Sequence, residues 1–184
     1  MSDTGTATIL LVDDEPNLVD LYETFLSGEY DIRTATGGEE ALEVVDESVD
    51  VVLLDRRMPG VTGDEVLEEI RARSLNVRTA MLTAVEPDTD IIDMPFDDYR
   101  VKPVDRSDLI ATVELLLERA TYDAQSQEFF SLASKKAALE IADRDDTDEY
   151  RRLTEELGER RDDIDETLDR VSAKEAFKEL PDSE

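Results

Sequence analysis

Short apolar segments alternate with amphipathic segments along about the first 115 residues of the chain. Five apolar runs, several rich in β-branched residues, are typical of strands: 7–12, 30–35, 51–54, 77–82 and 96–101. Between them, apolar residues recur at helical spacing in 18–28, 38–45, 63–73 and, more weakly, 88–94. Strands that alternate with helices predict an α/β domain whose parallel sheet is covered by helices on both faces.

The order of the strands follows from the short loops between them. Right-handed crossovers leave few topologies, and we predict the flavodoxin-like order 2-1-3-4-5. In that order the carboxyl ends of the first, third, fourth and fifth strands meet at one edge of the sheet. The residues directly after those strands are polar, and we expect them to converge in one crevice: Asp13, Asp14, Asp55, Thr83 and Lys102.

Three carboxylates in one crevice repel one another, because two unit charges 4 Å apart cost about 4 kcal/mol at an effective dielectric of 20. A divalent cation removes this repulsion. The chain has no His and no Cys, so the candidate metal ligands are oxygen atoms, which suit Mg²⁺. An aspartate beside a metal, an ammonium group and a hydroxyl is arranged to accept a phosphoryl group. Asp55, Lys102 and Thr83 are the residues that we expect to provide this chemistry.

The motifs around these residues resemble those of the receiver domain of two-component response regulators. The resemblance covers about residues 7–120 and rests on five motifs in order: Asp13-Asp14, Asp55, Met58-Pro59-Gly60, Leu82-Thr83-Ala84 and Tyr99-x-x-Lys102-Pro103. It implies that a sensor histidine kinase phosphorylates Asp55. It also implies a signalling switch whose only chemistry of its own is slow self-dephosphorylation.

The same resemblance implies a role for each site residue. Mg²⁺ would be held by Asp13, Asp14, Asp55 and the main-chain carbonyl of Arg57. Lys102 would pair with the phosphoryl group, and Thr83 would move to contact it. Tyr99 matches the position of the aromatic switch that turns inward on activation.

Most of the remainder of the chain is predicted to form two helices, separated by a polar break at 143–148 and followed by a tail from Pro181. Residues 105–142 contain no Gly or Pro, which predicts one long helix, with a break near Thr121 left open. In a second helix, four apolar residues lie seven apart and two more fill between them: Tyr150, Leu157, Ile164 and Val171, with Leu153 and Leu168. An antiparallel hairpin with coiled-coil character is expected. This segment, 121–180, resembles the HalX domain found behind receivers in haloarchaeal proteins, a name that carries no biochemical role.

The charge of the chain narrows its class further. There are 20 basic and 49 acidic residues, a formal net charge of −29. Only five of the basic residues are Lys, and this composition resembles cytosolic proteins of halophilic archaea. At molar salt the Debye length is about 3 Å, so such self-repulsion is tolerated there. No apolar run approaches the roughly 18 residues of a membrane span, so we expect a cytoplasmic protein without membrane contact.

Three functions compete for this pattern. The first is a phosphorylation switch whose helical module forms a homodimer or binds a helical protein partner. The second is a transcriptional regulator that binds DNA through the C-terminal segment. It is disfavoured because residues 143–170 hold 13 acidic and 6 basic residues. The third is a metal-dependent phosphatase or other hydrolase that uses Asp55, for which the chain lacks further acid–base residues.

Overall fold

The computed structural model describes residues 5–85, 91, 93–141 and 146–178. The chain divides into two compact units, Met1–Leu117 and Glu118–Glu184, and each is described by itself. The boundary between them falls within helix α4, which belongs to both.

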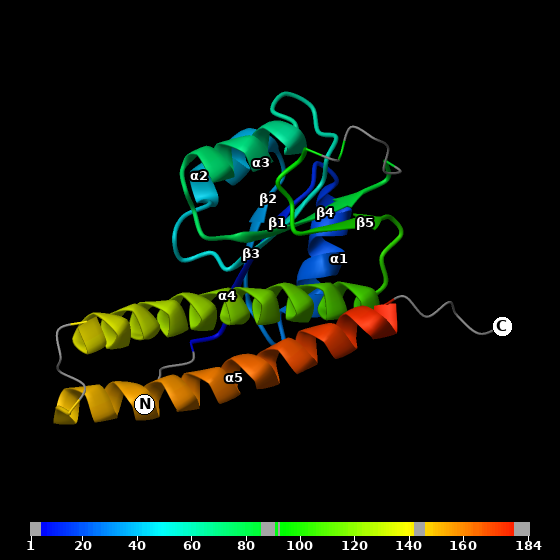
Figure 1. The fold of residues 1–184 in the computed structure, drawn as a ribbon. Coiled ribbons are helices and arrows are strands. Elements are labelled where there is room, and N and C mark those ends of the chain that lie inside the picture. Colours follow the sequence, from blue (N-terminus) through cyan, green and yellow to red (C-terminus); the bar gives the residue numbers. More distant parts are fainter. Residues whose placement is uncertain (1–4, 86–90, 92, 142–145, 179–184) are drawn as a thin grey trace. The chain divides into compact units, whose positions relative to one another are not determined.

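A five-stranded parallel sheet forms the centre of the first unit (Figure 1). Its strands are β1 (Thr8–Val12), β2 (Asp31–Ala35), β3 (Val51–Leu54), β4 (Arg78–Thr83) and β5 (Asp98–Val101). Their order is β2-β1-β3-β4-β5, which confirms the predicted flavodoxin-like topology. The register pairs Val12 with both Ala35 and Leu54, and Thr83 with Val101. The carboxyl ends of four strands therefore lie along the same edge, where the polar residues follow.

Each face of the sheet carries its own apolar core, because successive residues of a strand point to opposite faces. On one face, Leu10, Val12, Val52, Leu54 and Met81 pack with buried residues of α2 (Gly38–Val44) and α3 (Gly63–Ala72). On the other face, Ile9, Leu11, Val51, Leu53 and Leu82 pack with α1 (Pro16–Leu26) and with the beginning of α4. All of these residues belong to the three inner strands β1, β3 and β4 and are at most 3% exposed, so those three strands are nearly continuous apolar runs.

Local sequence signals set where these helices begin. Pro16 occupies the first turn of α1, where its missing N–H costs nothing. Thr62 caps α3 in a capping box, because its hydroxyl accepts from the Glu65 amide while the Glu65 carboxylate accepts from the Thr62 amide. The predicted helix over 88–94 falls largely on residues 86–90 and 92, outside the described residues.

The second unit is a helical hairpin. Helix α4 runs without interruption from Arg106 to Ile141 over 36 residues, and α5 covers Asp148–Lys178. The two helices are antiparallel within this unit, since Glu128 forms an ion pair with Arg160 at 2.9 Å and Glu140 accepts a hydrogen bond from the Tyr150 hydroxyl at 2.6 Å. None of the helices among the described residues combines the length and apolarity that crossing a bilayer requires.

One residue of the predicted apolar stripe on α5 lies elsewhere. Val171 is 8% exposed, as a stripe residue should be, but Leu168 is 43% exposed and Thr167 is only 1% exposed. The reason is the seven-residue repeat: positions 150, 157, 164 and 171 share their face with residues three further along, and 167 is such a position while 168 is not. The placement of Leu168 in the buried stripe was therefore wrong.

Candidate functional site

Three carboxylates meet at the carboxyl edge of the sheet. Asp13 and Asp14 follow β1 and Asp55 follows β3, and one carboxylate oxygen from each lies within 4.8 Å of the others. Asp13 is 3% exposed, Asp55 is 7% exposed and Asp14 is half-buried. Hydrogen bonds fix the main chain here, since the Asp55 amide donates to the Val12 carbonyl at 2.9 Å. Close acidic groups of this kind are suited to a hard divalent cation.

Lys102 supplies the positive charge of the crevice. Its Nζ lies 2.5 Å from Oδ2 of Asp13 and 3.8 Å from Oδ2 of Asp55. Its amide donates to the Thr83 carbonyl at 2.9 Å, which holds the end of β5 beside the end of β4. Burial alone would lower the pKa of Lys102, but the hydrogen bond to Asp13 and the charges of Asp13 and Asp55 outweigh it and raise the pKa. The ammonium group is therefore firmly protonated.

Asp55 is held in an environment that disfavours its charge. Burial raises the pKa of Asp55 above its ordinary value. Lys102 opposes this rise, Asp13 and Asp14 add to it, and the hydroxyl of Thr83 favours the charged form. Thr83 itself is fully buried, and its Oγ1 accepts a hydrogen bond from the Val85 amide at 3.3 Å. A cation added to the crevice would relieve the repulsion, so the residues present fit a bound Mg²⁺.

The loop that follows Asp55 is packed tightly against the first turn of α3. The Gly63 amide donates to the Arg56 carbonyl at 2.8 Å. A Cβ on Gly63 would lie 2.1 Å from the Asp55 carbonyl oxygen, so only glycine fits there. The nearly buried Arg56 side chain forms a bidentate pair with Asp64, with Nε at 3.0 Å from Oδ1. Sequence reasoning assigned no role to this pair, which ties the residue after Asp55 to α3.

Two further predicted residues lie near the crevice. The Tyr99 ring is half-buried, 5.5 Å from the ring of Phe96, and its hydroxyl donates to the Val85 carbonyl at 2.7 Å. It thus contacts the segment that follows Thr83. The Arg57 side chain is exposed, two residues after Asp55.

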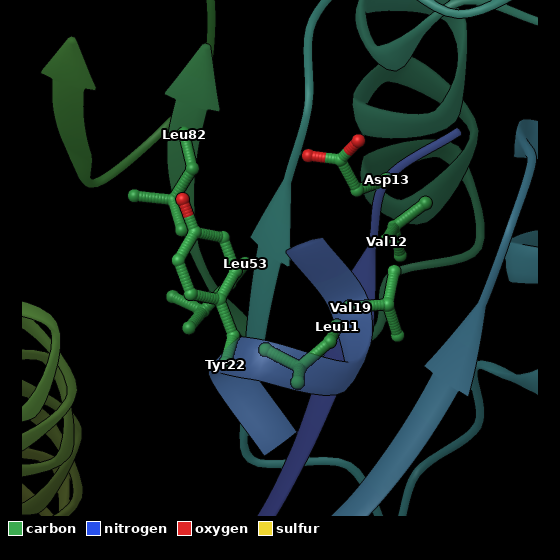
Figure 2. Close-up of a pocket in the computed structure, with 7 residues that line it drawn as sticks. All are labelled: Leu11, Val12, Asp13, Val19, Tyr22, Leu53 and Leu82. Atoms are coloured by element: carbon green, nitrogen blue, oxygen red, sulfur yellow. The ribbon is translucent and has the colours of Figure 1, made fainter. Parts of the chain in front are cut away.

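Tyr22 is a residue of the crevice that sequence reasoning treated only as part of an apolar helix face. Its ring is 4% exposed and lines a cavity of about 10 Å³, which is too small for a ligand. The other residues that line this cavity are Leu11, Val12, Asp13, Val19, Leu53 and Leu82 (Figure 2). Burial raises the pKa of Tyr22, and the charges of Lys102, Asp13 and Asp55 act on it as well. The sequence offered one signal for this position: Tyr22 carries a hydroxyl among apolar neighbours on α1, the helix that follows the acidic end of β1.

A five-stranded sheet of this order with carboxylates at its edge defines the class of CheY-like receiver folds. The family model described as the response regulator receiver domain matches residues 9–114, and the model of the HalX domain matches residues 118–181. The chain therefore belongs to the response regulator receiver family, with a HalX domain after the receiver.

Relatives and solved structures agree with this membership. A Haloferax volcanii protein provisionally named a transcriptional regulator is 57% identical over 136 residues, 73% of this chain and 23% of that protein. A Haemophilus influenzae transcriptional regulatory protein, a CpxR homolog, is 42% identical over 61% of this chain and 51% of its own length. The chain thus spans about half or less of these relatives. Its acidic composition is consistent with the haloarchaeal source of the first.

Two solved structures match the receiver unit. A response regulator receiver domain from Clostridium thermocellum has a TM-score of 0.58 and 26% identity, covering 62% of this chain and 97% of that one. The response regulator TrrA from Thermotoga maritima, solved in complex with Mg²⁺-BeF, has a TM-score of 0.52 and 37% identity, covering 60% of this chain and 99% of that one.

Proposed function

We propose that this protein is a two-component response regulator in which Asp55 accepts a phosphoryl group from a sensor histidine kinase. The observation that carries the proposal is the position of the Lys102 ammonium, which lies 2.5 Å from Asp13 and 3.8 Å from Asp55 among three clustered carboxylates. The receiver family and the TrrA complex with Mg²⁺-BeF support it.

The residues of the crevice have different roles in the phosphoryl transfer. In the transfer, an oxygen of the Asp55 carboxylate bonds to phosphorus as the phosphorus–nitrogen bond of a phosphohistidine breaks, and the electron pair of that bond returns to the imidazole. Asp13, Asp14, Asp55 and the main-chain carbonyl of Arg57 would hold Mg²⁺, which supplies positive charge to the phosphoryl oxygens when bound. Lys102 pairs with the new phosphate oxygens and Thr83 donates to them.

The phosphate then biases the segment between Thr83 and Lys102. Tyr99 is the proposed switch, because its hydroxyl is bonded to the Val85 carbonyl in that segment and must release it to turn inward. We take the receiver to be residues 7–120 and the helical module to be residues 121–180, so that α4 (Arg106–Ile141) extends from one into the other. We assign the module the role of an interaction domain whose state follows that of the receiver. We assign the receiver no catalytic activity on other substrates.

A labelling experiment tests the acceptor. The full chain is incubated with acetyl phosphate at molar KCl, with Mg²⁺ or with EDTA, and analysed by mass spectrometry. We expect the gain of one phosphoryl group on Asp55, only with Mg²⁺ and only in the wild type and the matched control Asp20→Asn, since Asp20 is exposed on α1. Labelling that persists in Asp55→Asn would show that another residue is the acceptor.

Direct DNA binding by the C-terminal segment is the second candidate function, favoured by the names of the two relatives above. The acidic excess of residues 143–170 opposes it. A mobility-shift assay at molar KCl with the full chain, phosphorylated and not, separates the two: a shift on genomic fragments that survives competitor DNA favours direct binding.

A further inference from the structure

Most of α5 stays exposed in the hairpin, and four of its exposed residues form one strip along the helix. Gly158, Arg161, Asp165 and Leu168 are all exposed, and their spacing of three and four residues puts them on one side of the helix. Leu168 is 43% exposed, one of three large apolar side chains among the described residues that are at least 40% exposed. An exposed leucine between charged residues raises the question of what covers it.

The hairpin has a groove beside this strip. It has a volume of about 340 Å³ and is lined from α4 by Phe129, Ala133, Lys136 and Glu140, and from α5 by Leu157, Gly158 and Arg161. A Cβ on Gly158 would meet no atom within 4 Å, so no side chain of the described residues fills the space above it. The groove therefore offers an apolar floor with room for a side chain.

The charges at the groove have the opposite sign to the chain as a whole. Lys136 and Arg161 both line it, whereas its one acid, Glu140, accepts from the Tyr150 hydroxyl at 2.6 Å and lies 3.8 Å from Lys136. Arg160 pairs with Glu128 at 2.9 Å; its neighbour Arg161 has no ion pair among the residues that the structure describes. The groove thus suits an apolar side chain accompanied by a carboxylate, and Leu168 with Asp165 is such a pair.

The positions on the strip are self-complementary. Positions 158 and 168 lie five residues on either side of position 163, and positions 161 and 165 lie two residues on either side of it. If two copies of α5 cross antiparallel about a two-fold axis at this point, Gly158 of one faces Leu168 of the other, and Arg161 faces Asp165. We propose that the HalX unit forms a homodimer in this way, with Leu168 of each copy seated over Gly158 of the other.

Salt should promote this dimer. Each copy carries a formal net charge of −29, so two copies repel strongly in dilute salt. Molar salt reduces the Debye length to about 3 Å, which removes long-range repulsion, and leaves the apolar contact of Leu168 in place. The proposal does not depend on phosphorylation of Asp55.

The test is sedimentation equilibrium of the full chain from dilute buffer to molar KCl. We expect a monomer in dilute salt and a dimer in molar KCl. Arg161→Asp and Asp165→Arg should each weaken self-association at least tenfold, because like charges then face each other. An equimolar mixture of the two variants should associate again, because one chain carries acids at both positions and the other carries arginines. Arg152→Asp, an exposed site on the opposite side of α5, is the control for the charge change and should dimerise like the wild type.

A second variant separates the interface from the folding of the helix. Gly158→Met fills the space over Gly158 and replaces a residue of low helix propensity by a good helix former. In dilute salt, where both chains are monomeric, its melting temperature should therefore not fall below that of the wild type, whereas the dimer in molar KCl should be lost. A wild type that stays monomeric at every salt concentration overturns the proposal. So does a dimer that survives in Arg161→Asp and Gly158→Met, or a variant mixture that does not associate.

Discussion

Replacing Asp55 by Asn should stabilise the protein at neutral pH when no divalent cation is present. Burial, helped by Asp13 and Asp14, raises the pKa of Asp55, so the folded protein binds this proton more tightly than the unfolded chain does. Stability then falls as pH rises from the ordinary Asp pKa of about 3.9 through the raised pKa of the folded state. Asn carries no charge and removes that loss.

The magnitude follows from the charges around Asp55. Carboxylate oxygens within 4.8 Å of one another repel by about 3.5 kcal/mol for each pair at an effective dielectric of 20, whereas Lys102, at 3.8 Å from Asp55, attracts by about 4.4 kcal/mol. Loss of the Asp55 charge removes two repulsions and one attraction. The free energy of unfolding therefore rises by about 2–3 kcal/mol. Asp14 is half-exposed, and solvent screening reduces the gain to about 1–2 kcal/mol.

The assay is thermal unfolding followed by circular dichroism in EDTA at fixed molar KCl, from pH 4 to pH 8. The Asp55→Asn variant should melt about 2–8 °C above the wild type at pH 7, and the difference should shrink toward zero as pH approaches the ordinary Asp pKa. Mg²⁺ should raise the melting temperature of the wild type more than that of the variant. The control is Asp20→Asn, which should change little. An Asp55→Asn variant that melts at or below the wild type at pH 7 would refute this account of the crevice.

Two further substitutions test neighbouring contacts. Gly63→Ala should destabilise the protein by about 3 kcal/mol in urea unfolding, because its Cβ would lie 2.1 Å from the Asp55 carbonyl; Gly28→Ala, whose Cβ meets nothing within 4 Å, is the control, and equal stabilities for the two would contradict the clash. Thr83→Val should lower the affinity for Mg²⁺-beryllofluoride about tenfold by removing the hydroxyl donor, while Thr83→Ser should retain most of it; equal losses in both would point to packing rather than to the hydroxyl.

The sheet and its order could be predicted because its three inner strands, β1, β3 and β4, are buried on both faces. Runs such as Val51–Leu54 are apolar throughout and are followed by a charged residue. The run identifies the strand, and the charged residue marks both the end of the strand and a candidate site residue. The parallel topology then brings the strand ends together. Asp13 and Asp55 lie 42 residues apart in the chain, yet a carboxylate oxygen of each lies within 4.8 Å of the other.

What the sequence did not reveal depends on small rotations and on packing. A shift of one residue around α5 separates buried Thr167 from exposed Leu168, and a leucine is ordinarily the better core residue. Only the facing helix decides which of the two is covered. The role of Tyr22 was equally difficult to predict, because its spacing identifies a core position but not that its ring lines the same small cavity as Asp13.

Two local charge arrangements stand out against a chain of net charge −29, one at the crevice and one at the groove. In molar salt, the field of the distant carboxylates is screened over about 3 Å. Contacts at that range or closer, such as Lys102 to Asp13 at 2.5 Å, keep most of their strength because they are also partly buried. A high-salt environment therefore removes the long-range repulsion that would otherwise dominate the binding of any anion or second copy. Which groups face each other at contact distance then decides what the protein binds, both at Asp55 and along α5.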